Sequence, residues 1–295
     1  MKNSVQSVIG NFLIVSVCFL VSSMTLAADG DPIVHANIPY YSEAVLTNAD
    51  DYQKSQCRLD VFVPVDAERL PVLIWFHGGG LTGGQKDVPK FLKQERIVLV
   101  AVGYRLSPNA KFPEFLEDAA ASVAWAFANI ERYGGDSKRI FVGGYSAGGY
   151  LSAMIGMDSR WLKPYHLTPN DLAGLVLLSA QVTTHFHVKE TLHYPGHRLL
   201  PVIDENSPLH YVSPELPPII LVLGDRKIEW PVRVEENELL ASTLQKMGHP
   251  HVEFHENPGY DHGTIGNTNG DFAPEAAVQI RDFLIRFGNM PHGDE

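Results

Sequence analysis

A serine stands between two glycines in the segment GYSAG, residues 144–148, which follows a short apolar run and opens a helical segment. This G-x-S-x-G spacing between a strand and a helix predicts a nucleophile elbow, a strained turn that lifts the serine hydroxyl above the sheet. A side chain at either glycine would collide across so tight a turn. The alternative is a structural Gly-Ser turn, which the flanking elements disfavour. We therefore predict that Ser146 is a nucleophile for acyl transfer.

Three glycines follow His77, directly after another apolar run. Acyl transfer places negative charge on the former carbonyl oxygen, and fixed backbone N–H groups can stabilise that charge without reorganising. Bare backbone at Gly78, Gly79 and Gly80 can approach a substrate closely, so these residues are candidates for an oxyanion hole. The N–H of Ala147, next to the serine, is a further candidate donor. We expect His77 to be structural.

A nucleophilic serine needs a base, and His262 is the best placed of thirteen histidines. It follows the last apolar run and precedes the final helical pattern, on a loop at the end of the predicted sheet. The pair His185 and His187 resembles a metal-binding pair only weakly, because no third ligand has matching spacing. We therefore predict His262 as the base, with no metal and no organic cofactor.

The base in turn needs a carboxylate that orients it and stabilises its cation. Two candidates, Asp225 and Glu229, follow the apolar run at residues 219–223. The chain order serine, acid, histidine is that of enzymes with a nucleophile elbow. Both candidates satisfy this order, so spacing alone leaves the acid open.

Alternating strands and helices must position these residues. Several apolar runs of strand length are too continuous to have a hydrated face, which indicates a sheet covered on both sides. Amphipathic helical patterns separate them, so the sequence predicts a doubly wound, mostly parallel α/β sheet flanked by helices. The expected strands are 59–63, 72–76, 97–102, 140–142, 175–178, 219–223 and 252–255, and the clearest helices are 116–130, 234–247 and 274–287.

Composition excludes several classes of protein. The chain has 295 residues, of which 45% are hydrophobic and 19% charged, so disorder, coiled coil and collagen are excluded. The formal charge of −11 would repel phosphate backbones, so nucleic acid is not an expected partner. A small-molecule substrate is the partner that the candidate residues imply.

The amino terminus resembles a targeting segment. Lys2 precedes a ten-residue apolar stretch, and small residues stand before a cleavage point after Ala27, so residues 1–27 read as a secretory signal peptide. We expect a secreted or periplasmic protein without membrane insertion once the signal is removed, the alternative being an uncleaved anchor. Residues 28–295 would form one domain whose only cysteine, Cys57, is a packed thiol. The long irregular stretch at 181–218 is expected to form a short lid or pocket wall, with His185 and Phe186 lining a compact pocket.

The motifs HGGG, GYRLSP, YGGD, GYSAGG and GYDHG together resemble the esterase and lipase branch of the α/β-hydrolase fold. The resemblance extends from about residue 59 to residue 287, and it is greatest to carboxylesterases that include hormone-sensitive-lipase-like, feruloyl-esterase-like and arylformamidase-like members. It implies a carboxylic ester hydrolase with Ser146 and His262 in the triad and the HGGG glycines in the oxyanion hole. Compared with hormone-sensitive-lipase-like enzymes, we expect no large amino-terminal cap, so the lid would come mainly from residues 181–218.

The chain departs from the resembled family at the acid, because Lys227 stands where an Asp is common. Glu229 lies 19 positions before Gly248, which resembles the family's interval from the acid to the glycine that ends the next helix. We therefore favour Glu229, with Asp225 as the alternative. Other functions compatible with these residues are an arylformamidase or peptidase with the same triad, and a non-catalytic binding module of the same fold.

Overall fold

The computed structural model describes residues 30–266 and 272–289. The predicted signal peptide lies outside the described residues, so export stays a prediction. Within the described ranges, no helix combines the length and the apolar character that crossing a membrane requires.

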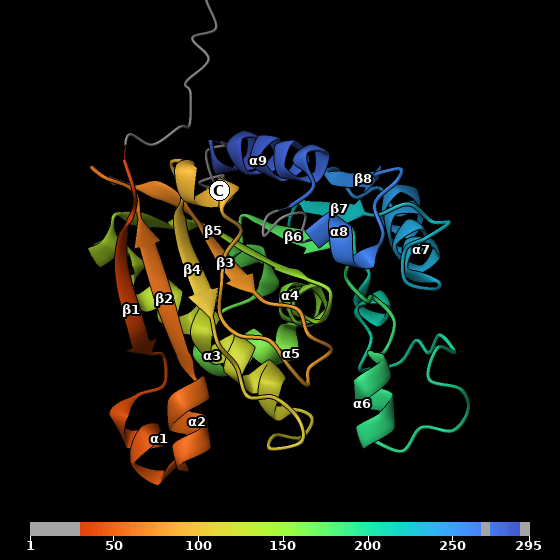
Figure 1. Cartoon of the computed structure of the whole chain (residues 1–295), viewed down its shortest axis with the longest axis horizontal. Helices are drawn as coiled ribbons and strands as arrows, with labels where there is room; N and C mark the ends of the chain where they lie inside the picture. The colour runs from red at the N-terminus through yellow and green to blue at the C-terminus, as the bar shows by residue number, and fades with distance from the viewer. Residues whose placement is uncertain (1–29, 267–271, 290–295) are drawn as a thin grey trace, which may run out of the picture.

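An eight-stranded sheet forms the centre of the described structure, in the order β1-β2-β4-β3-β5-β6-β7-β8 (Figure 1). From β3 onward all neighbouring strands are parallel, whereas β2 pairs antiparallel with both β1 and β4. The prediction of a mostly parallel sheet is confirmed. The strands are β1 Ile33–Pro39, β2 Arg58–Val63, β3 Leu70–Phe76, β4 Val98–Val102, β5 Gly135–Tyr145, β6 Gly174–Leu178, β7 Ile219–Leu223 and β8 Val252–Glu256.

Helices cover both faces of the sheet, as Figure 1 shows for α9 on one side and α3 and α4 on the other. The α-helices are α1 Glu43–Asn48, α2 Asp51–Gln56, α3 Glu114–Asn129, α4 Ala147–Met157, α5 Ser159–Leu162, α6 Phe186–Thr191, α7 Arg233–Lys246, α8 His262–Gly266 and α9 Pro274–Gly288. Short 3₁₀ helices are η1 Phe91–Gln94, η2 Ile130–Tyr133, η3 Lys163–Tyr165, η4 Pro169–Asp171 and η5 Pro208–Tyr211.

Strand β3 illustrates why the central strands read as unbroken apolar runs. Alternate side chains point to opposite faces of a strand. Ile74 packs in the core shared with α3, α4 and α7, and Leu73 packs in the core shared with α9. Every residue of β3 is buried, so neither face needs polar residues. Burial on both faces therefore fixes the strand and its place near the middle of the sheet.

Two strands differ from the sequence-based expectation. β1 was not predicted, because it is an edge strand whose residues are mostly exposed and show no apolar alternation. β5 begins at Gly135 and not at residue 140, because polar residues before the apolar run extend the strand beside β3. Neither difference moves a candidate site residue, since the candidates follow the carboxyl ends of β3, β5, β7 and β8.

Candidate active site

The turn between β5 and α4 has the geometry of a nucleophile elbow. Ser146 has φ +55° and ψ −115°, a strained conformation for a residue other than glycine. A Cβ at Gly144 would lie 2.4 Å from the carbonyl carbon of Gly148, and one at Gly148 would lie 2.0 Å from the carbonyl oxygen of Phe76. Both glycines are therefore required by close backbone approach, as the sequence predicted.

A continuous chain of hydrogen bonds joins Ser146, His262 and Glu229. Ser146 Oγ lies 2.9 Å from Nε2 of His262, within hydrogen-bond distance. Nδ1 of His262 lies 2.6 Å from Oε1 of Glu229. The carboxylate can only accept, so Nδ1 carries the proton and Nε2 is left to accept from the serine hydroxyl. This is the protonation state that a general base requires.

The Glu229 carboxylate is buried and surrounded by donors. Oε1 also accepts from the backbone N–H of Trp230 at 2.7 Å, and Oε2 accepts from Ser179 Oγ at 2.8 Å. Burial alone would raise the pKa of Glu229, but the hydrogen bond from His262, the electrostatic interaction with that residue and the other donors hold it below its ordinary value. The carboxylate is therefore ionised where it faces the imidazole.

Asp225, the alternative acid, lies in the same loop, but its carboxylate accepts hydrogen bonds from backbone N–H groups. Its Oδ1 accepts from the N–H of Lys227 at 3.0 Å, and its Oδ2 accepts from the N–H of Gly259 at 3.0 Å. These backbone hydrogen bonds lower the pKa of Asp225. Glu229 and not Asp225 is thus the carboxylate that reaches His262.

The glycine loop after β3 lies against the serine. Gly79 and Gly80 have φ +117° and +66°, and both line the pocket that contains Ser146. Ala147 is the first residue of α4, so its N–H is one of the amides that a helix leaves without an intrahelical acceptor. His77 stacks on Tyr104 with ring centroids 4.3 Å apart, and burial lowers its pKa. His77 is therefore structural here, as expected.

A pocket of about 330 Å³ opens in front of Ser146. Tyr145, Phe186 and Trp230 form its aromatic walls, and the side chain of Arg233 also lines it. The Tyr145 hydroxyl donates to the backbone carbonyl of His262, and the two rings stack 5.3 Å apart. These contacts fix the position of His262 against the Tyr145 ring.

The segment at 181–218 contributes one wall of this pocket. Phe186, the first residue of α6, lines it as predicted, but His185 does not. His185 is buried between Tyr150 and Phe186, where burial lowers its pKa well below the ordinary value. The prediction for His185 was therefore wrong, because its ring packs into the core.

Sequence reasoning missed Trp230 and Arg233 as pocket residues. Both lie within four positions of Glu229, so their place after a candidate acid was the available signal. No group of three or more His, Cys, Asp or Glu side chains that could hold a metal ion occurs among the described residues.

Comparison with known proteins agrees with this geometry. A family model described as BD-FAE matches residues 59–244, more than half of the chain. The chain belongs to the BD-FAE family. The matched region includes the glycine loop, the nucleophile elbow and Glu229, whereas His262 lies beyond it.

Individual relatives of this BD-FAE member are esterases. Esterase LipC of Mycobacterium tuberculosis is 26% identical over 216 residues, which cover 65% of this chain and 53% of LipC. Carboxylesterase NlhH of the same species is 36% identical over 102 residues, covering 33% of this chain and 32% of NlhH. The chain thus matches between a third and about half of the length of these relatives.

Solved structures show the fold. Thermogutta terrifontis esterase 2 superposes with a TM-score of 0.69 at 21% identity, covering 90% of this chain and 98% of that one. This likeness, with the sheet order described above, confirms the predicted α/β-hydrolase fold.

The elbow geometry predicts unequal effects of two glycine substitutions. Gly148→Ala should destabilise the protein by about 1–3 kcal/mol, because its Cβ meets backbone that cannot yield. Gly83→Ala is the matched control, since the nearest atom to its Cβ is 3.9 Å away, and it should change stability by less than about 0.5 kcal/mol. Urea unfolding of both variants measures the difference; equal stabilities would contradict the close approach.

Proposed function

We propose that this protein is a serine hydrolase of carboxylic esters that acts through an acyl-enzyme intermediate. The observation that carries the proposal is the hydrogen-bonded chain Ser146, His262 and Glu229 at the wall of an aromatic pocket. The esterase relatives support the same chemistry.

In this mechanism Ser146 Oγ attacks the acyl carbon while His262 Nε2 takes its proton. His262 then returns the proton to the leaving alcohol, and water releases the acyl group in a second step assisted by the same base. Glu229 remains ionised throughout and stabilises the imidazolium that forms. Its low pKa, buried position and 2.6 Å contact with Nδ1 suit it to this role.

The tetrahedral intermediate needs donors for its oxyanion. We assign this role to backbone N–H groups of the Gly78–Gly80 loop and of Ala147. Gly79 and Gly80 line the pocket beside Ser146, and the N-terminal end of α4 carries partial positive charge toward the same point. Each such donor is worth roughly 10²- to 10³-fold in rate.

The pocket favours a compact acyl group. Its volume of about 330 Å³ is at the small end for ligand sites, and Tyr145, Phe186 and Trp230 line it. Phe186 lies in the segment between Thr184 and Asp204, whose two ends are joined by hydrogen bonds. The Thr184 side chain donates to Asp204, and the Thr184 N–H donates to the carbonyl of Val202, which restrains this pocket wall. Thermogutta terrifontis esterase 2 has been solved with propionate and with butyrate bound, which agrees with a small acyl site. We propose short or aromatic acyl esters as substrates.

Loss of the nucleophile gives the first test. Ser146→Ala should reduce hydrolysis of 4-nitrophenyl acetate by roughly 10⁴-fold or more, because no acyl-enzyme can form. Ser152→Ala, which removes a buried hydroxyl in the second turn of the following helix α4, is the control and should keep most of the activity. Retention of more than about a tenth of the turnover by Ser146→Ala would exclude the mechanism.

The two carboxylates give the second test. Glu229→Gln should lower turnover by as much as about 10⁴-fold, because an amide cannot stabilise the imidazolium. Asp225→Asn should alter mainly the stability of its loop, since its partners are backbone amides. Steady-state turnover and urea unfolding of both variants check this, and the reverse ranking of turnover would assign the acid to Asp225.

Acyl length gives the third test. Across 4-nitrophenyl esters, kcat/KM should be highest for acetate to butyrate or for an aromatic acid, and should fall for long chains that a pocket of this size cannot enclose. A series that peaks at about ten or more acyl carbons would show that the pocket opens into a long groove.

A further inference from the structure

The carboxylate of Glu229 is held at both of its oxygens. Oε1 faces His262, while Oε2 accepts from Ser179 Oγ at 2.8 Å and from the N–H of Gly224 at 3.2 Å. The Glu229 side chain is fully shielded from solvent, so water does not compensate for a missing donor. Ser179 therefore supplies a side-chain donor to the second oxygen, and Gly224 supplies a backbone donor.

Ser179 occupies an unusual backbone position. It follows β6, is fully buried, and has φ +44°, a left-handed conformation that glycine adopts with less strain. Its N–H donates to the carbonyl of Val222 in β7 at 2.8 Å, which fixes it beside the strand that leads to Glu229. A serine in this conformation contributes a hydroxyl that glycine cannot.

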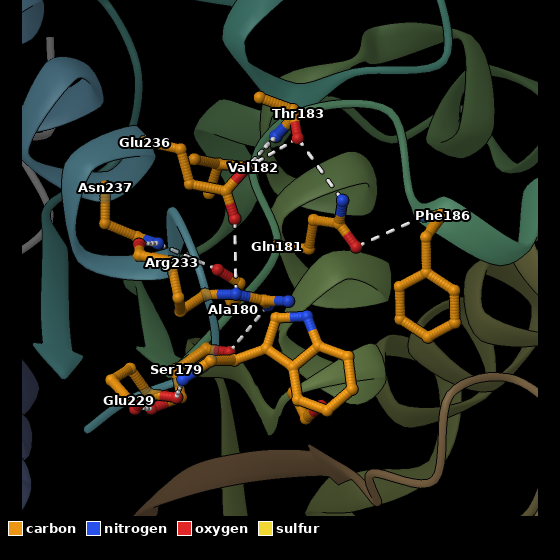
Figure 2. Close-up of polar contacts among 12 residues, drawn as sticks. Ser179, Ala180, Gln181, Val182, Thr183, Phe186, Glu229, Arg233, Glu236 and Asn237 are labelled. Atoms are coloured by element: carbon orange, nitrogen blue, oxygen red, sulfur yellow. Dashed lines mark hydrogen bonds and ion pairs between the residues drawn. The ribbon is translucent and has the colours of Figure 1, made fainter. Parts of the chain in front are cut away.

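Two residues at the start of α7 donate hydrogen bonds to the segment that carries Ser179 (Figure 2). Arg233 Nη1 donates to the carbonyl of Ser179 at 2.9 Å, and Asn237 Nδ2 donates to the carbonyl of Ala180 at 2.8 Å. Arg233 Nε also lies 3.2 Å from Glu236 Oε1, and both side chains are buried. A buried ion pair adds little stability relative to apolar residues of the same size, so stability alone does not account for this pair.

The same network continues to the wall of the pocket. Glu236 Oε2 accepts from Thr183 Oγ1 at 2.6 Å, and Gln181 Nε2 donates to Thr183 Oγ1 at 3.3 Å. Gln181 Oε1 in turn accepts from the N–H of Phe186 at 3.2 Å. Figure 2 shows these contacts as an unbroken path from Glu229 to Phe186. One polar network thus contacts both the acid and a residue of the pocket wall.

We propose that Ser179 is a positioning residue that orients Glu229 toward His262. The buried Arg233–Glu236 pair, in this proposal, fixes the positions of Ser179 and of Phe186 relative to each other. This inference rests on the ester hydrolase function proposed above. It gives the Arg233–Glu236 pair a role in holding the site and not in contacting the reacting atoms.

The direct test removes the Ser179 side chain, whose hydroxyl is the donor to Glu229. Ser179→Gly suits φ +44°, so the backbone has no reason to move. Without this donor, kcat for 4-nitrophenyl acetate should fall by roughly 10- to 100-fold with little change in KM, since a hydrogen bond to a charged group is worth about one to two powers of ten. Ser207→Ala, which removes a buried hydroxyl bound to the carbonyl of Val182, is the matched control and should retain kcat.

The pH profile separates a positioning role from a structural one. Without the Ser179 donor, the Glu229 carboxylate becomes more basic and attracts the proton of the imidazolium more strongly. The pH at which the catalytic dyad gains its proton should therefore rise, and the acidic limb of the kcat/KM profile should shift to higher pH in Ser179→Gly. The charged and titratable groups that face Glu229 are His262, Arg233 and Tyr145, and all three remain in this variant. Ser207→Ala should keep the parent profile, with product release followed at the isosbestic wavelength of nitrophenol.

A second variant tests the ion pair. The double substitution Arg233→Met with Glu236→Leu leaves no unpaired buried charge, so the protein should still fold. Its kcat should fall as in Ser179→Gly. Its KM should rise because the backbone of Phe186 is less firmly held and because Arg233 itself lines the pocket. Parent values of both constants in a folded double variant would overturn the role of the pair.

Ser146→Ala, measured alongside, distinguishes the two proposals. If Ser146→Ala is inactive while Ser179→Gly keeps the parent kcat and pH profile, the positioning role is wrong and the hydrolase function stands. If Ser146→Ala hydrolyses the ester as well as the parent protein does, the hydrolase function fails and the positioning role fails with it.

Discussion

The hydrogen bond between Ser146 and His262 depends on bringing together the ends of two strands that are not neighbours. Strands β5 and β8 are separated by β6 and β7, and at roughly 4.8 Å per strand their axes lie about 14 Å apart. Loops must therefore bridge the sheet edge and be held there. The contacts around Glu229 provide this, since the acid follows β7 and its Oε1 accepts a hydrogen bond from the imidazole Nδ1. The rest of the site follows from that bridging.

Burial makes the bridging effective. In water a carboxylate and an imidazole would exchange partners freely, whereas the shielded Glu229 has a fixed donor at each oxygen. The low local dielectric strengthens these hydrogen bonds and also makes an unpaired group costly. The rings of Tyr145 and Trp230 both pack against His262, at centroid distances of 5.3 and 5.8 Å. The site is thus organised before a substrate enters.

The sequence allowed the central sheet to be predicted because its strands are buried on both faces and read as unbroken apolar runs. The edge strand β1 has no such signal, since its residues face solvent. The elbow and the glycine loop were predictable because close backbone approach demands glycine at particular positions, which local sequence records. Glu229 was favoured as the acid because of its distance in sequence from Gly248, and Glu229 is the carboxylate that contacts His262.

Ser179, Trp230 and Arg233 carried no comparable signal. Their contributions arise from contacts between segments that are far apart in the chain, such as the 54 residues that separate Arg233 from Ser179. A serine after a strand, or an arginine at the start of a helix, has many ordinary uses, so its residue type alone does not predict its partner. His185 illustrates the opposite error: it was predicted to line the pocket because it precedes Phe186, but its side chain is buried in the core.

The central claim is that Ser146 carries the acyl group during turnover, and trapping that intermediate tests it most directly. The protein would be mixed with a slowly deacylating ester, quenched in acid during steady turnover, digested and mapped by mass spectrometry. The account predicts an acyl group on the peptide that contains Ser146, forming at least as fast as the ester is consumed. Steady hydrolysis with Ser146 unmodified, or with the acyl group on another side chain, would contradict it.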